Sequence, residues 1–359
     1  MEKNMSANQS HVTTDEINEI LSRREDLTEQ QTKYAMEEIL HGRMDDEQLA
    51  SFITLLHAKG ETADELATLV RTMWDNSPSL SDLDIEVDIS GALDTCGTGG
   101  DMSGTFNIST AAALVLAAAG IPIAKHGNRA ASSRCGGADV LEALGIPVGL
   151  SPLATAQLFT QTGFTFLFAP TFHPGMRFAA PVRKALGVPT TFNFLGPLAN
   201  PYHVPFRLHG VSQPTILETY IKTLAELGVE RAYVFHGLGG LDEISLSGVT
   251  HGYRLLNEEI VAKSVDPQEL GFASASLEEL KGGDAQQNAE MITSIFSGAS
   301  GPTRDIVVLN AAVGYDLVRG VGLPVAITHI ADFIDSGMVS RKVAEISQVA
   351  QALAMSMQR

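Results

Sequence analysis

The chain is short of cysteine, aromatic residues and positive charge. Its 359 residues include two cysteines, one tryptophan and 6% aromatic residues, and 24 lysines and arginines against 42 aspartates and glutamates, for a formal net charge of −18. Two cysteines make no disulfide framework, and a reducing compartment fits them. The acidity argues against nucleic acid or an anionic membrane as the main partner. A small anionic substrate is not excluded, because a few basic residues can make a local positive pocket.

Long hydrophobic runs are also missing. The longest, residues 111–123, is too short to span a bilayer and is interrupted by Gly120 and Pro122. The opening residues, MEKNMSANQSHVTTDE, lack the apolar core of a signal peptide. We therefore expect a cytoplasmic protein with no membrane partner. Apolar residues make up 44% of the chain, which at this length predicts a globular protein of two domains, one of them large.

Helical signals dominate the first part of the chain. Three pairs of residues have the capping-box spacing: Thr13 with Glu16, Thr28 with Gln31, and Thr62 with Glu65. Apolar residues recur at helical spacing between these caps. Residues 76–91 are rich in Asp, Ser and Pro and are typical of a linker. We predict a small, mainly helical domain with its linker over residues 1–91.

From residue 92 onward, strand-like and helix-like segments alternate. Strand candidates are 122–125, 165–169, 207–211, 232–235 and 306–309, of which the last could equally open a helix. Helix candidates are 111–119, 138–144, 152–162, 176–186, 215–227, 285–296 and 324–335. This alternation predicts an α/β domain over residues 92–359, with helices flanking a sheet. Some later helical segments are candidates for packing on the small domain.

Two loops rich in glycine and hydroxyl groups each precede an apolar helix candidate. The first runs from Gly97 to Asp101 and continues to residues 107–110; the second covers residues 125–133. Glycines let backbone N–H groups approach a phosphate, and a helix start adds unpaired donors and the positive end of its dipole. Neither loop has the P-loop or the dinucleotide-binding pattern. Either alone would pass for a turn, but together, with Lys125 and Arg129, they predict one polyanionic ligand held from two sides.

An acidic pair and a helical arginine are weaker signals. Asp242 and Glu243 follow a glycine-rich turn and precede a strand-like segment, 244–246. Adjacent carboxylates suit a hard cation that also holds phosphate oxygens, although exposed acidic pairs are common in so acidic a chain. Arg183 lies in the helix candidate 176–186, where a solvated surface role is the simpler interpretation. Both cysteines lie in or beside the two loops and are expected to be small filler.

Taken in order, these segments resemble the anthranilate phosphoribosyltransferases. The resemblance rests on DTCGTGGD (94–101), NIST (107–110), KHGNRAASS (125–133), ADVLEALG (138–145), HPGMRFAAPVRKALG (173–187), NFLGPLANP (193–201) and LDE (241–243). It implies the nucleoside phosphorylase/phosphoribosyltransferase fold, with a hinge between the helical and α/β domains and a homodimer formed through the helical domain. The implied reaction transfers the phosphoribosyl group of phosphoribosyl pyrophosphate (PRPP) to anthranilate, with Mg²⁺ as cofactor, in the second step of tryptophan biosynthesis from chorismate.

The resemblance also implies roles for individual residues. Donor contacts would be Gly97, Gly100, Asp101, Thr105, Asn107, Ile108, Ser109, Thr110, Lys125, His126, Gly127, Asn128, Arg129, Ala130, Ala131, Ser132, Ser133 and Gly137. Anthranilate contacts would be Gly97, Asn128, His173, Met176, Arg183 and Pro197, and metal ligands Ser109, Asp242 and Glu243. No side chain is expected to act as general acid or base, because an aromatic amine is neutral near pH 7. Lys125 and Arg129 would act through charge and positioning.

Two positions depart from the family pattern, and three alternatives stay open. Gly137 stands where serine is common, and Phe172 precedes His173 where a second histidine is common. A nucleoside phosphorylase of the same fold would have no reason to keep Arg183 with Asn128. A nucleic-acid-binding relative without transferase activity conflicts with the net charge and with the acidic pair. A transferase for another aromatic amine is compatible with every motif.

Overall fold

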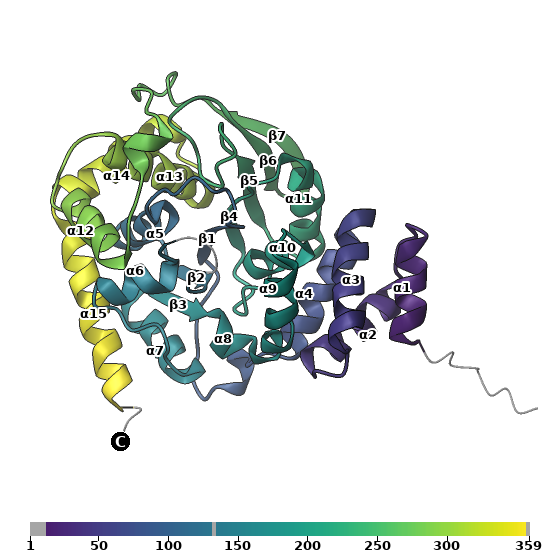
Figure 1. The fold of residues 1–359 in the computed structure, drawn as a ribbon. Helices are drawn as coiled ribbons and strands as arrows, with labels where there is room; N and C mark the ends of the chain where they lie inside the picture. Colours follow the sequence, from purple (N-terminus) through teal and green to yellow (C-terminus); the bar gives the residue numbers. More distant parts are fainter. Residues whose placement is uncertain (1–11, 131–133, 357–359) are drawn as a thin grey trace, which may run out of the picture.

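A computed structural model describes residues 12–130 and 134–356 of the chain. They form a helical bundle on one side and, next to it, a seven-stranded sheet with helices packed against it (Figure 1). Three predicted donor contacts, Ala131, Ser132 and Ser133, lie outside the described residues.

The bundle begins with four helices. They are α1 (Thr14–Ser22), α2 (Glu29–Leu40), α3 (Asp46–Lys59) and α4 (Ala63–Asp75). The three predicted capping boxes form at α1, α2 and α4, and α3 has a further one between Asp45 and Gln48. Each box satisfies N–H groups that a helix start leaves unpaired. Apolar stripes on the four helices then close one buried core.

Later helices complete this helical core. They are α9 (Ala180–Leu186), α10 (Thr191–Leu198) and α11 (Leu217–Glu226). Their residues Val182, Phe192 and Tyr220 belong to the same buried cluster as Phe52 of α3 and Leu69 of α4. Segments more than a hundred residues apart in sequence are therefore packed together. The limits 1–91 and 92–359 for the two domains stay a prediction.

The sheet has the strand order β3-β2-β1-β4-β5-β6-β7. Its parallel strands are β1 (Leu93–Gly97), β2 (Ile123–Gly127), β3 (Phe164–Phe168), β4 (Phe206–Gly210) and β5 (Arg231–His236). An antiparallel hairpin, β6 (Thr250–Leu256) and β7 (Glu259–Val265), closes one edge. Its turn residues Asn257 and Glu258 both have positive φ, at 51° and 65°, as a tight hairpin requires.

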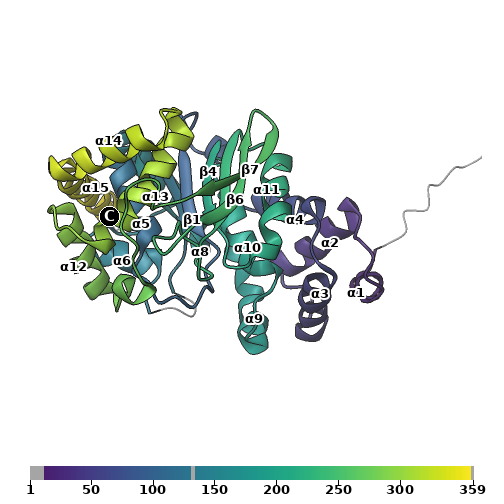
Figure 2. The ribbon, with the colours of Figure 1, turned by 90° about the horizontal axis from the view of Figure 1, so that it is seen from above.

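The sheet separates two apolar cores. On β5, Tyr233 and Phe235 face one core, whereas Ala232 and Val234 face the helical core, as the two-residue period of a strand dictates. The core that contains Tyr233 and Phe235 is covered by these helices: α5 (Ile108–Ala118), α6 (Gly137–Ala143), α7 (Pro152–Thr162), α12 (Ala285–Phe296), α13 (Pro302–Arg319), α14 (Leu323–Asp335) and α15 (Met338–Ser356). Figure 2 shows the sheet between this layer and the side of α11 and the bundle.

In the described part of the chain, no single helix has the length and apolar composition of a membrane span. α13 and α14 meet such a criterion only when taken together, and they are bent by 118° at their junction. Both contribute buried residues to the core beside the sheet.

Several predicted elements are corrected by the structure. Residues 306–309 belong to α13, so the helical alternative was right there. The candidate 176–186 is divided into a 3₁₀ segment, Pro174–Phe178, and α9, with Pro181 in the first turn of α9, where a missing N–H is tolerated. Residues 244–246 are not a strand. Strands β1, β6 and β7 and helices α10 and α15 were not predicted.

Candidate active site

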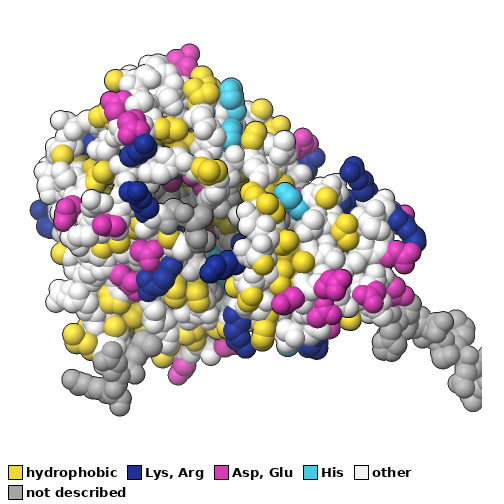
Figure 3. Space-filling model, in the orientation of Figure 1, with side chains coloured by type: hydrophobic (Ala, Val, Ile, Leu, Met, Phe, Trp, Pro, Cys, Tyr) yellow, Lys and Arg dark blue, Asp and Glu magenta, His cyan; other side chains and the backbone are white. Residues whose placement is uncertain are grey.

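The two predicted loops lie at one edge of the sheet. β1 ends at Gly97 and β2 at Gly127, and the two strands are parallel neighbours, so both loops leave from the same carboxyl edge. In open α/β sheets, ligands bind beyond this edge. Figure 3 shows several lysine and arginine side chains around a hollow in the middle of one face, with acidic side chains beside them as well as on the bundle side. Basic side chains therefore gather around this hollow despite the net charge of −18.

Asp242 lies tightly against the first loop. Its Oδ2 accepts the Gly99 N–H at 2.7 Å. A Cβ built on Gly97 would lie 2.1 Å from the same oxygen, and one on Gly210 would lie 1.8 Å from the Asp242 carbonyl oxygen. Only glycine fits at the ends of β1 and β4, because Asp242 occupies the space that side chains would need.

Glu243 contacts the other end of the first loop. Its Oε1 accepts the Ser109 N–H, in the first turn of α5, at 2.9 Å. A carboxylate is favourable there, because N–H groups and the helix dipole present positive charge. Lys125 is 3% exposed, and its ammonium donates to Ser109 Oγ at 3.2 Å and also to the Thr95 carbonyl. Ser109, Asp242, Glu243 and Lys125 thus lie around the start of α5 and the first loop, and their roles stay a prediction.

The electrostatics of the acidic pair fit a bound cation. Burial and then repulsion from Asp101 raise the pKa of Asp242, while burial and Asp242 raise the pKa of Glu243, which Lys125 lowers in part. Lys125 thus compensates the charge of these carboxylates only in part. The Ser109 hydroxyl and the two carboxylates supply oxygen ligands only, which is the donor set that Mg²⁺ prefers. The three predicted metal-ligating residues therefore fit the cofactor.

The second loop is tied to α6. Arg129 forms a fork with Glu142, with Nη1 and Nη2 each 2.7 Å from a carboxylate oxygen, and Nη1 also lies 3.0 Å from Asp139. Asp139 Oδ2 accepts the N–H groups of Ala130 and Gly136, at 3.0 Å and 2.9 Å. Arg129 is thus paired with acids of its own chain, which its predicted role in donor binding did not anticipate.

Other predicted donor residues are held by internal contacts. Asn107 donates to the Cys135 carbonyl at 3.1 Å and accepts from Asn288 at 2.9 Å. Asn128 Oδ1 accepts the Arg129 N–H at 2.8 Å, and Thr105 and Ser103 share a hydrogen bond of 3.1 Å. Ile108 and Thr110 are buried in the first turn of α5, and Gly100 has a φ of +76° in the turn that precedes Asp101.

Gly137, where serine is common in the resembling family, starts α6 beside α5. A Cβ built there would lie 3.3 Å from Thr110 Oγ1 and 3.9 Å from the Lys125 side chain. A larger residue would thus meet Thr110, and the glycine leaves that space open. Phe172 is 1% exposed and packs edge-on against Tyr202, with ring centroids 6.0 Å apart. Phe172, the second position that departs from the family pattern, therefore contributes to a buried apolar core.

Two buried histidines fasten α10 to its surroundings. His126 Nδ1 bonds to the Gly196 carbonyl, and His173 Nε2 to the Ala199 carbonyl, each at 2.8 Å. A carbonyl oxygen only accepts, so these ring nitrogens carry the protons. Burial lowers the pKa of His126 to about 4 and that of His173 to about 3, and both rings are neutral at pH 7. Met176 is half-buried in the 3₁₀ segment after His173, and Pro197 is buried in α10.

Arg183 is a half-buried cation on α9. Its guanidinium lies over the Phe192 ring, 5.7 Å from the centroid. Burial lowers its pKa, and among the described residues no carboxylate forms an ion pair with it. A partly desolvated guanidinium without an acid partner suits an anionic ligand. This environment differs from the solvated surface position that was the simpler expectation.

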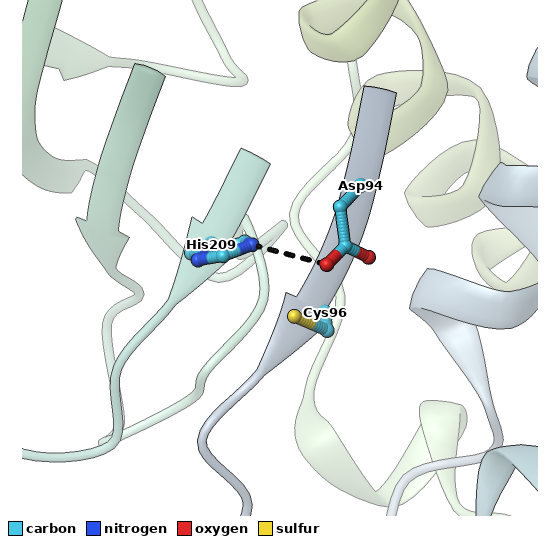
Figure 4. A group of neighbouring side chains, drawn as sticks. All are labelled: Asp94, Cys96 and His209. Atoms are coloured by element: carbon cyan, nitrogen blue, oxygen red, sulfur yellow. Dashed lines mark ion pairs between the residues drawn. The ribbon is translucent and has the colours of Figure 1, made fainter. Parts of the chain in front are cut away.

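A buried ionic network under the site was missed in the sequence. The Asp94 carboxylate accepts hydrogen bonds from the Arg207 guanidinium at 3.1 Å, from the Asn200 amide at 2.9 Å and from the backbone N–H of His126 at 3.1 Å. His209 Nε2 lies 3.8 Å from the same carboxylate, and Cys96 lies next to them (Figure 4). Burial would raise the pKa of Asp94, but His209, Arg207 and Asn200 together hold it below its usual range.

Asp94, Cys96 and His209 are close enough to suggest a metal site, but the chemistry does not fit one. Burial and Asp94 raise the pKa of the Cys96 thiol, so it is not a thiolate. The Arg207 guanidinium already neutralises Asp94 and would repel a metal ion. The signals in the sequence were Arg207 and His209, two polar residues inside the strand candidate 207–211.

Asn310 is a second residue that the sequence analysis missed. Its side chain accepts the Ile244 N–H and donates to the Ile244 carbonyl, each at 3.0 Å. It is 2% exposed on α13. This double contact anchors the backbone directly after Asp242 and Glu243, and a lone asparagine in an apolar helical stretch was its only trace in the sequence.

Two family models match the chain. The model described as "Glycosyl transferase family, helical bundle domain" matches residues 14–77, and "Glycosyl transferase family, a/b domain" matches residues 90–339. The anthranilate phosphoribosyltransferase of Desulforamulus reducens is 42% identical over 330 residues, which cover 91% of this chain and 94% of that protein. That of Pelotomaculum thermopropionicum is 44% identical over 89% of this chain and 92% of its own length.

Solved structures agree. The anthranilate phosphoribosyltransferase from Thermus thermophilus has a TM-score of 0.86 at 35% identity and covers 93% of this chain and 99% of that one. The enzyme from Saccharomyces cerevisiae in complex with PRPP and Mg has a TM-score of 0.85 at 26% identity, covering 94% and 98%. The predicted fold class, a small helical domain with a larger α/β domain of the phosphoribosyltransferase type, is confirmed. The chain belongs to the anthranilate phosphoribosyltransferase family.

Proposed function

We propose that this chain transfers the phosphoribosyl group of PRPP to the amine of anthranilate, giving N-(5-phosphoribosyl)anthranilate and pyrophosphate in tryptophan biosynthesis. The observation that carries the proposal is the contact of Asp242 and Glu243 with both ends of the first loop, at Gly99 and Ser109. One acidic pair thereby aligns the glycine turn with the start of α5. Lys125 reaches the same place through Ser109.

The donor would lie against the two loops. Its pyrophosphate would meet Gly97–Asp101 and Lys125, and its ribose and 5′-phosphate would meet residues 107–110 and the segment that begins at Arg129. The first turn of α5 presents N–H groups and a positive dipole to an anion. Lys125 adds a buried positive charge, and its ammonium donates to two neutral oxygens, the Thr95 carbonyl and the Ser109 hydroxyl. Both features favour a ligand rich in phosphate.

Ser109, Asp242 and Glu243 would hold Mg²⁺, which when bound compensates the charge of the departing pyrophosphate. Gly97 leaves room for the Asp242 carboxylate and Gly210 leaves room for the Asp242 backbone, because a side chain on either residue would displace Asp242. Asn310 fixes the following backbone through Ile244.

The acceptor would lie between the loops and the helical core. Arg183 would pair with the anthranilate carboxylate through its planar fork, and Asn128 would provide a polar contact. Pro197, Met176 and the two buried histidines would form the walls. The histidine N–H groups are committed to the carbonyls of α10 and its C-terminal end, so the rings hold the walls in position.

The transfer needs positioning and charge more than proton movement. The C1–O bond to pyrophosphate breaks and the C1–N bond to the amine forms. Positive charge grows on ribose C1 and negative charge on pyrophosphate, and Lys125 stabilises the latter. The amine attacks in its neutral form and releases a proton to water after the new bond has formed. No general base is therefore required, in keeping with the neutral, hydrogen-bonded histidines.

Two further expectations belong to this proposal. Two copies would associate through the α1–α4 side, which size-exclusion chromatography with light scattering tests directly. The protein would act in the cytoplasm, and the buried cysteines, which form no disulfide, support a reducing compartment.

The reaction is tested by following anthranilate fluorescence with PRPP, with and without Mg²⁺. We expect loss of the signal only when enzyme, PRPP and Mg²⁺ are all present, with one pyrophosphate released per anthranilate consumed. A folded protein that binds PRPP but consumes no anthranilate would contradict the acceptor assignment. Other aromatic amines, and nucleosides with phosphate, would then be tested as substrates.

A further inference from the structure

Among the described residues, the carboxylate of Glu142 forms hydrogen bonds with the guanidinium of Arg129. Both of its carboxylate oxygens accept from that guanidinium at 2.7 Å. The nearby Asp139 differs from Glu142. Besides its contact with Arg129, it accepts the backbone N–H groups of Ala130 and Gly136 and so holds the loop backbone. Removing Glu142 would therefore leave Arg129 with Asp139 as its remaining acid partner, at 3.0 Å, without removing the acceptor that holds the loop.

The Arg129–Glu142 pair lies at the ligand edge of the sheet. Arg129 lies two residues after the end of β2, and its guanidinium lies 5.6 Å from the centroid of Phe168, the last residue of β3. Gly137, at the start of the helix that carries Glu142, adjoins Thr110 and Lys125. A phosphate placed against Lys125 and the start of α5 would thus lie in the neighbourhood of Arg129.

We propose that Glu142 is a positioning residue that competes with the donor's phosphate for Arg129, so that donor binding includes an exchange of the Arg129 fork from carboxylate to phosphate. The inference deepens the proposed function and rests on it. The pair is suited to exchange, because the side chains of Arg129 and Glu142 are 48% and 40% exposed. Exposed ion pairs are weak, and phosphate offers the same bidentate geometry with more negative charge.

The test is a double-mutant cycle on PRPP binding, measured by calorimetry without acceptor and by steady-state kinetics. For Glu142→Gln we expect donor Kd and KM to fall about three- to fivefold, the strength of one exposed ion pair. The anthranilate KM should not change. Glu142→Ala is measured in parallel, because its methyl group cannot accept a hydrogen bond from Arg129 as a glutamine can.

The Arg129→Gln background separates exchange from simple charge removal. If Glu142 acts through Arg129, the gain disappears in Arg129→Gln/Glu142→Gln. An equal gain in both backgrounds would mean that Glu142 only repels phosphate at a distance. Unchanged or weaker donor binding in both Glu142 variants would mean that the pair is purely structural. Either result overturns the proposal. Failure of the wild-type protein to bind PRPP would instead contradict the proposed function.

Discussion

At the scale of single residues, unusual environments distinguish functional from structural charges. Arg183 and Arg207 are both shielded arginines, but Arg207 is paired with Asp94, whereas Arg183 has no carboxylate partner among the described residues. The sequence predicted a role for Arg183 only through a family resemblance, since spacing alone favoured a solvated position. It gave no role to Arg207, because the partner of a buried charge is set by the sheet, where Asp94 and Arg207 are direct neighbours on β1 and β4.

Replacing Arg183 tests the acceptor role. Arg183→Ala should raise the anthranilate KM about ten- to a hundredfold, the loss expected for a charge-assisted hydrogen bond of roughly 1.5–3 kcal/mol. The donor KM should stay nearly constant, because the loops are untouched. Arg183→Lys should recover part of the loss, since it restores charge without the fork. Equal changes in both KM values would remove Arg183 from the carboxylate role.

Replacing Asp94 tests the buried network. Asp94→Asn leaves Arg207 buried without its counter-charge, and we expect a loss of about 3–5 kcal/mol in the free energy of unfolding. Because the folded pKa of Asp94 is depressed, its contribution is present above its ordinary pKa of 3.8 and is lost as the pH falls below it. The difference in the free energy of unfolding between variant and wild type, measured with urea, should therefore become smaller in acid. The exposed Asp88→Asn is the control, and equal stability of the two variants would contradict this account.

At the scale of elements, local sequence signals predicted the limits of some helices well but predicted strand pairing poorly. The helices α7 and α12 begin and end at the predicted residues, and three caps form as expected. The hairpin β6–β7 was missed because β7 is mostly exposed and lacks an apolar alternation. α10 was missed because Gly196 and Pro197 lie inside it, and its tertiary contacts outweigh these local helix breakers.

The strand end at Gly97 offers a test at this scale. Gly97→Ala places a Cβ 2.1 Å from Asp242 Oδ2, so the carboxylate must move. We expect a large loss of Mg²⁺-dependent activity, with the far-UV circular dichroism retained. Gly149→Ala is the matched control, because a Cβ there meets no atom within 4 Å and its φ is not in the left-handed region. Wild-type activity in Gly97→Ala would show that the close approach has no functional importance.

At the scale of the whole molecule, the site is assembled from segments far apart in sequence. Asp242 and Glu243 follow β5, and they reach Gly99 and Ser109 because β1, β4 and β5 are neighbours in the sheet and Asn310 of α13 anchors the next residue, Ile244. The sequence predicted these residue types and one shared ligand. It could not predict their hydrogen bonds, or that Arg129 would pair with Glu142, because those depend on how α5, α6 and α13 pack.

The central claim is that Asp242 and Glu243 make donor binding depend on Mg²⁺. Calorimetric titration of PRPP with and without Mg²⁺ tests it in wild type, in Asp242→Asn/Glu243→Gln, and in Glu258→Gln/Glu259→Gln, an exposed adjacent pair with the same charge change. We predict that Mg²⁺ strengthens PRPP binding by wild type and by the control but has little effect on the Asp242/Glu243 variant. Full enhancement by Mg²⁺ in that variant would contradict the account.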